Sequence, residues 1–148
     1  MAKSYYSTVF EQSADEVWNT IRDFNNYPVW VDGVGESRIE EGRSGDAVGA
    51  VRNVFFQDNR IRQRLLALSD TNRTQTYEFA EGPPPYLPGL QDFQATLRVT
   101  PIVDGDRAFV EWEATFDCNA DRRDALKSHL CNAFAKWLGS LRRSLQKS

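Results

Sequence analysis

The sequence has few histidines and cysteines, which supply the ligands of zinc sites and the thiol nucleophiles of many enzymes. Its 148 residues include one histidine, two cysteines and one methionine. A single histidine excludes the H-E-x-x-H pattern of zinc enzymes, and the chain has neither a G-x-S-x-G nor a G-x-x-x-x-G-K-[ST] motif. We therefore predict no metal and no bound cofactor, and we find no clear catalytic constellation.

An excess of positive charge and long apolar runs are lacking too. The 18 basic and 21 acidic residues give a formal net charge of −3, whereas a nucleic-acid-binding domain needs a basic face. No run approaches the roughly 20 apolar residues of a membrane span, and the opening "MAKSYYSTVF" lacks the apolar segment of a secretory signal. We expect a cytoplasmic protein that binds no nucleic acid and inserts into no membrane, with Cys118 and Cys131 as free thiols. Its oligomeric state is left open.

Apolar side chains are plentiful enough for one full core. Hydrophobic residues make up 41% of the chain, which predicts a single domain over residues 1–148. "SYYSTVFEQ" has the composition of a first strand, and Ser13 and Glu16 then form a capping box that starts a helix. Pro28 in "NNYPVW" disfavours helical geometry at Tyr27, so we expect this helix to end there and a second short one to follow.

Alternating apolar and polar residues then predict a long antiparallel meander. Turn-forming clusters separate strands near residues 34–41, 47–56, 59–68, 73–80, 92–101 and 107–117. The last of these strands carries Ala108, Val110, Trp112, Ala114 and Phe116 on one face. Such alternation with a period of two indicates a sheet with one covered and one wet face.

The final segment, Asp121 to Gln146, supplies the cover. Its apolar residues recur at helical spacing, which predicts a long amphipathic helix. The expected fold class is therefore α+β: a curved antiparallel sheet of about seven strands wrapped around a long C-terminal helix, with two short helices after the first strand.

Several motifs in this order resemble one known family. They are Trp18, Phe24, the "YPVW" of Tyr27–Trp30, Gly33, the G-x-x-R of Gly49 and Arg52, "IRQRLLALSD", "FQATLRVTP", and Trp112 in "FVEWEATF". Together they resemble the START-like, or SRPBCC, helix-grip superfamily, and within it the bacterial polyketide cyclase/dehydrase-like branch. The resemblance covers nearly the whole chain. It implies an apolar cavity between the sheet and the last helix.

The proline-rich stretch "EGPPPYLPGLQDF", Glu81 to Phe93, is too long and stiff for a hairpin turn. By resemblance it would form a lip over the cavity mouth, with Tyr86, Leu87 and Leu90 facing the ligand. As a surface loop it would contribute little to stability. The alternative is a rigid connector with no part in binding.

Side chains of the sheet and the last helix complete the predicted pocket wall. They are Tyr77, Phe79, Phe93, Trp112, Ala133 and Trp137. Aromatic residues in a pocket would hold planar or lipidic molecules, although ordinary core packing explains them equally well. His129 flanks the same helix face, where it either reaches the cavity edge or is a boundary histidine.

Gln63 is the most informative polar residue. It alternates with Ile61, Leu65 and Ala67, so we predict that it points inward. By resemblance, relatives often carry an acid at this position, in E-R-L instead of Q-R-L. An amide exchanges no protons near pH 7, which weakens a catalytic interpretation.

Arg52 and Asn53 are neighbours on one predicted strand, so only one of them faces inward, where it could donate to a ligand carbonyl. The resulting hypothesis is a protein that binds a hydrophobic, lipidic or aromatic, small molecule. Two alternatives remain: a cyclase or dehydratase acting in the same cavity, and a protein-interaction module.

Overall fold

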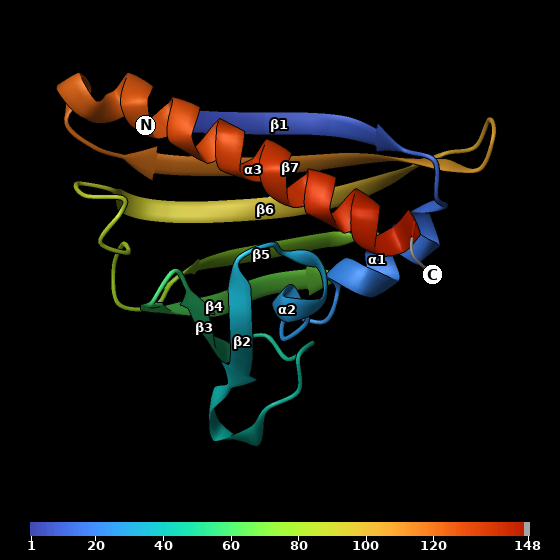
Figure 1. Ribbon diagram of the computed structural model, residues 1–148, viewed down its shortest axis with the longest axis horizontal. Coiled ribbons are helices and arrows are strands. Elements are labelled where there is room, and N and C mark those ends of the chain that lie inside the picture. Colours follow the sequence, from blue (N-terminus) through green and yellow to red (C-terminus); the bar gives the residue numbers. More distant parts are fainter. Residues whose placement is uncertain (147–148) are drawn as a thin grey trace.

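The computed structural model describes residues 1–146 and shows a seven-stranded antiparallel sheet curled around one long helix. The elements are β1 (Ala2–Phe10), α1 (Ala14–Ile21), α2 (Tyr27–Trp30), β2 (Val34–Ile39), β3 (Val51–Phe56), β4 (Asn59–Ser69), β5 (Thr74–Phe79), β6 (Gln91–Ile102), β7 (Arg107–Asp117) and α3 (Arg123–Gln146), with single turns η1 (Glu40–Gly42) and η2 (Ala120–Arg122). The strand order is β1-β7-β6-β5-β4-β3-β2. In Figure 1, α3 lies diagonally across one face of the sheet, with α1 and α2 near its C-terminal end. The predicted α+β helix-grip architecture is confirmed.

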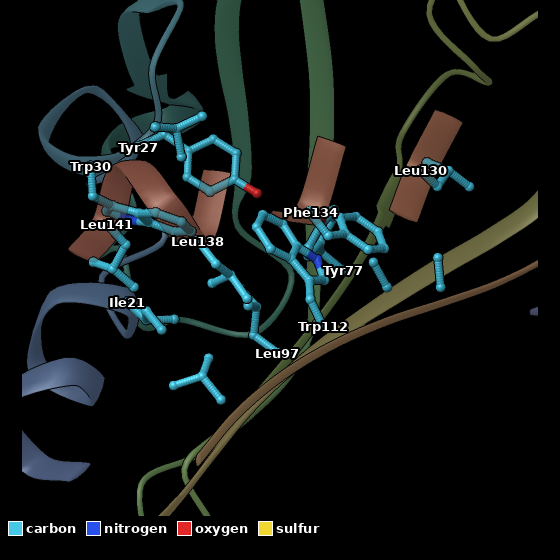
Figure 2. Packing of buried hydrophobic residues seen from close by; sticks show 14 of the residues in the cluster. Ile21, Tyr27, Trp30, Tyr77, Leu97, Trp112, Leu130, Phe134, Leu138 and Leu141 are labelled. Atoms are coloured by element: carbon cyan, nitrogen blue, oxygen red, sulfur yellow. The ribbon is translucent and has the colours of Figure 1, made fainter. Parts of the chain in front are cut away.

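The sheet and α3 bury their apolar faces against each other. The alternation predicted for β6 and β7 is confirmed, since Leu97 and Trp112 are fully buried. The ring of Trp112 stacks on that of Phe134 of α3, with centroids 4.6 Å apart and an angle of 10° between the planes. Figure 2 shows Phe134 and Leu138 packed with these sheet residues. Within residues 1–146, no helix is both long and apolar enough to cross a membrane.

The hairpin between β3 and β4 sets the register on which the site depends. Gln57 and Asp58 form its two-residue turn, and both have positive φ, at 49° and 65°. Two such residues are typical of the tight turn whose twist matches that of the strands. The turn pairs Phe56 with Asn59, and therefore Arg52 with Gln63 further along the ladder.

Two details of the predicted strands are wrong. The strand expected from residue 47 begins at Val51, because the chain turns at Gly49, which has a φ of 93°. Ala67 is exposed instead of facing inward. A bulge between Leu65 and Ala67 shifts the alternation by one residue, so Leu68 packs against the core in its place.

Helix α1 is capped as predicted and is tied to the β4–β5 turn. The Ser13 hydroxyl accepts a hydrogen bond from the Glu16 amide at 3.2 Å. Trp18 Nε1 and Arg22 Nε both donate to one oxygen of Asp70, each at 2.8 Å. Arg22, and then Trp18, lower the pKa of Asp70 to about 2. The ionised carboxylate therefore links α1 to the sheet.

This shift predicts a pH-dependent contribution to stability. Because the folded-state pKa of Asp70 lies below its ordinary value of 3.8, its contribution is fully present above that value and is lost as pH falls towards 2. Asp70→Asn should lower the Tm at pH 7, and its difference from the wild type should close below about pH 4. Thermal melts along a pH series measure this, with the exposed turn variant Asp104→Asn as control. A Tm difference that stays constant down to pH 2 would contradict the ionic explanation.

Candidate functional site

A cavity of about 300 Å³ lies between the sheet and α3. Strands β3, β4, β5 and β6 provide one wall through Phe56, Gln63, Tyr77, Phe79 and Phe93. Helix α3 provides the opposite wall through His129, Leu130, Ala133, Phe134 and Trp137. Tyr86 and Leu87 of the proline-rich lip also line the cavity. The remaining lining side chains, Gln57, Asn132 and Lys136, are exposed, so this side of the cavity is its mouth.

Aromatic rings dominate the inner surface. Phe79 and Phe93 lie with centroids 4.6 Å apart, and Tyr77 lies 6.2 Å from Phe93. Across the cavity, the Phe56 ring meets Trp137 edge to face at 5.9 Å. Such surfaces hold apolar and planar molecules by area and by ring contacts.

The lip is part of the core, which corrects the expectation that it would contribute little to stability. Leu87 and Leu90 are only 3% and 2% exposed. Two turns bring them inward, with Leu87 N–H donating to the Pro84 carbonyl and Leu90 N–H to the Leu87 carbonyl. An ion pair from Glu81 to Arg62 of β4 anchors the beginning of the lip. The prolines thus hold a loop whose apolar side chains are buried.

Nine of the residues predicted to bind ligand line the cavity. They are Gln63, Tyr77, Phe79, Tyr86, Leu87, Phe93, His129, Ala133 and Trp137. The other three do not line it. Arg52 and Trp112 are buried outside its wall, and Leu90 lines a separate hollow with Phe79 and Phe93. Contact with a ligand remains a prediction for every one of these residues.

The sequence analysis did not name several lining residues. Leu130 and Phe134 belong to the apolar face predicted for the final helix, but they were not named as pocket residues, although they lie three residues before and one after Ala133 on α3. The polar mouth residue Gln57 lies in the β3–β4 turn, where the alternation of the strands has ended. Only tertiary packing brings it to the helix.

Arg52, and not Asn53, faces the interior of the fold. Its side chain is 1% exposed, and its guanidinium carbon lies 3.7 Å and 3.5 Å from the ring centroids of Phe24 and Tyr27. Asn53, on the other face, donates to Glu40 and accepts from Arg60. Burial lowers the pKa of Arg52, but an arginine in a protein stays protonated near pH 7. A cation therefore lies within the core.

This cation has polar partners but no counterion among the described residues. Arg52 Nε donates to Gln63 Oε1 at 2.7 Å, and Nη1 donates to the Phe24 carbonyl at 2.9 Å. Nη2 is buried without a hydrogen-bond partner in residues 1–146, and so is the indole nitrogen of Trp112. Buried donors of this kind are costly unless something accepts from them.

The titratable groups of the cavity are mainly donors near pH 7. Burial, and then Tyr27, raise the pKa of Tyr77 well above its ordinary value. The same two causes raise the pKa of Tyr86 to about 12. His129 is exposed at the mouth, with its ring centroid 6.2 Å from that of Tyr86. No aspartate or glutamate lines the cavity within the described part of the chain, and no cluster there could hold a metal ion.

The fold and the cavity together define the class of this protein, a helix-grip domain with an internal apolar cavity. Comparison with known families agrees with this class. Residues 1–147 match the family described as polyketide cyclase/dehydrase and lipid transport, so the chain belongs to that family. The resemblance inferred from the sequence motifs is confirmed. No curated protein sequence matches the chain significantly.

Solved structures share the fold over nearly the full chain. A protein from Thermobifida fusca is 26% identical, with a TM-score of 0.85 over 99% of this chain and 95% of its own. XoxI from Bacillus cereus is 24% identical, with a TM-score of 0.84 over 99% and 96%. The di-domain ARO/CYC BexL is 12% identical, and its TM-score of 0.82 covers 99% of this chain but 47% of BexL. These likenesses concern the fold.

Proposed function

We propose that this protein binds a hydrophobic small molecule, lipidic or aromatic, in the cavity between the sheet and α3. The observation that carries the proposal is the cavity itself, about 300 Å³ with aromatic walls from β5, β6 and α3. Its volume matches the lower end of the roughly 300 to 1,000 Å³ range of small-molecule sites. The family description, which includes lipid transport, supports the same class of ligand.

The identity of residue 63, at the inner wall of the cavity, favours binding over catalysis. Gln63 stands where a carboxyl group could act as general acid or base, and an amide cannot do so near pH 7. Tyr86, with its raised pKa, is a weak acid and holds its proton. A cyclase or dehydratase activity remains the alternative that the family name suggests, and it requires product formation, which simple binding does not.

Saturable uptake of a neutral apolar dye is the expected result. N-phenylnaphthylamine should enter the cavity, gain fluorescence and accept energy from Trp137, which lines the wall, and from Trp112, whose ring lies 5.6 Å from that of Trp137. A fluorescence titration of the folded protein measures the binding. Linear, non-saturating fluorescence would show that the cavity admits no ligand, and would refute the proposed function.

A further inference from the structure

The orientation of the Gln63 amide is determined by its neighbour. An arginine side chain donates hydrogen bonds and accepts none, so the atom of Gln63 that faces Arg52 must be the oxygen. The observed bond, Arg52 Nε to Gln63 Oε1 at 2.7 Å, has this arrangement. This is the only hydrogen bond that the Gln63 side chain makes within residues 1–146, and Gln63 itself lines the cavity. Gln63 therefore offers the cavity a donor.

The surroundings of this amide are positive and rich in donors. The Arg52 guanidinium lies directly behind Gln63 and has no carboxylate partner within residues 1–146. Tyr77, which also lines the cavity, lies with its ring centroid 5.1 Å from the guanidinium carbon. An acceptor at this end of the cavity would meet the Gln63 amide, with a buried positive charge behind it.

We propose that the cavity selects apolar molecules that carry an anionic oxygen, as a carboxylate, phenolate or enolate, and that this oxygen accepts a hydrogen bond from the Gln63 amide at the inner end. Arg52 acts as a positioning residue: it fixes the amide and supplies the charge without touching the ligand. This inference rests on the proposed function and adds the chemical class of the ligand. A buried cation without a counterion favours the binding of an anion nearby. The protein interior screens the attraction between the two charges much less than water does.

A second cation could hold the anionic group in the opposite orientation. Lys136 lies on α3 at the cavity mouth and is exposed, so an acid could bind with its head outward. With the head group inward, Gln63 controls which head group is preferred; with the head group outward, Lys136 does. Exposed charges are screened by solvent and salt, which favours the buried site as the selective one.

The test compares three ligands with one chain and different heads: decanoate, decanol and decylamine. Each is titrated against the protein with bound N-phenylnaphthylamine, at pH 7 and below micelle-forming concentrations. Decanoate should displace the dye at a concentration at least about tenfold lower than decanol, and decylamine should be the weakest. Equal binding of all three would overturn this inference and leave the proposed function intact. Failure of all three, and of the dye, would overturn the proposed function itself.

Substitutions then locate the selective group. Gln63→Glu places a carboxylate against Arg52, cancels its charge and repels an acid, so the preference for decanoate over decanol should disappear. Gln63→Leu removes the donor and should reduce the preference about tenfold or more. Lys136→Met tests the opposite orientation and should leave the preference unchanged; Lys127→Met, exposed on the same helix outside the cavity lining, is the control. Melting temperatures establish that each variant is folded, and two Gln63 variants guard against one that is not. A preference lost in Lys136→Met, or retained in both Gln63 variants, would overturn the proposal.

Discussion

Replacing Leu87 and Leu90 together by alanine is expected to lower the free energy of unfolding by roughly 4 to 10 kcal/mol. Each leucine is almost completely buried, and a buried leucine-to-alanine change costs about 2 to 5 kcal/mol because it loses apolar contact and leaves a cavity. A domain of this size is stable by only about 5 to 15 kcal/mol, so the double variant should be close to unfolding. Chemical denaturation followed by circular dichroism measures the change.

Two controls separate burial from loop chemistry. Val103→Ala removes an exposed apolar side chain from another loop and should leave stability within about 0.5 kcal/mol of the wild type. Tyr86→Ser alters a half-buried lip residue and should have an effect smaller than that of the leucine pair. If the leucine pair costs no more than Val103→Ala, the lip is a surface loop after all.

Ala133→Trp is expected to weaken dye binding by on the order of a hundredfold while the protein stays folded. Ala133 lies in the middle of the α3 wall and is half-buried, so an indole placed there would occupy much of the 300 Å³ cavity. A hundredfold loss corresponds to about 2.7 kcal/mol of binding free energy. The measurement is the same fluorescence titration, accompanied by a thermal melt.

The matched control for this change is Ala125→Trp, which adds the same side chain to an exposed position of the same helix. It should bind the dye as tightly as the wild type. Undiminished binding to a folded Ala133→Trp protein would place the dye elsewhere on the molecule.

The sequence was enough to predict most of the architecture, because alternation and helical spacing report directly on burial. In β7 the buried face of Val110, Trp112 and Ala114 was predicted residue by residue, and the structure confirms it. Periodicity failed where the chain departs from regular geometry. No sequence pattern indicated the bulge that turns Ala67 outward. Leu87 was expected to face the cavity, but the proline-rich composition of the lip gave no sign that this leucine is packed into the core.

For the Arg52–Gln63 pair, the length of the turn between the two strands carries information that alternation alone does not. The alternation left open whether Arg52 or Asn53 faces inward, since both are polar. A two-residue turn at Gln57 and Asp58 makes Arg52 the cross-strand partner of Gln63, and inward Gln63 then requires inward Arg52. The lack of a counterion for Arg52 among residues 1–146 could not be predicted, because it depends on which side chains the fold brings around the guanidinium.

The most direct test of the central claim, an apolar ligand held between the sheet and α3, is an amide and indole NMR titration with decanol. We expect saturable shifts at Tyr77 and Phe93 of the sheet, at Ala133 of α3 and at the Trp137 indole, which line one cavity from two sides. Shifts confined to exposed apolar residues such as Val48 and Phe55, or no saturable shifts at all, would contradict it.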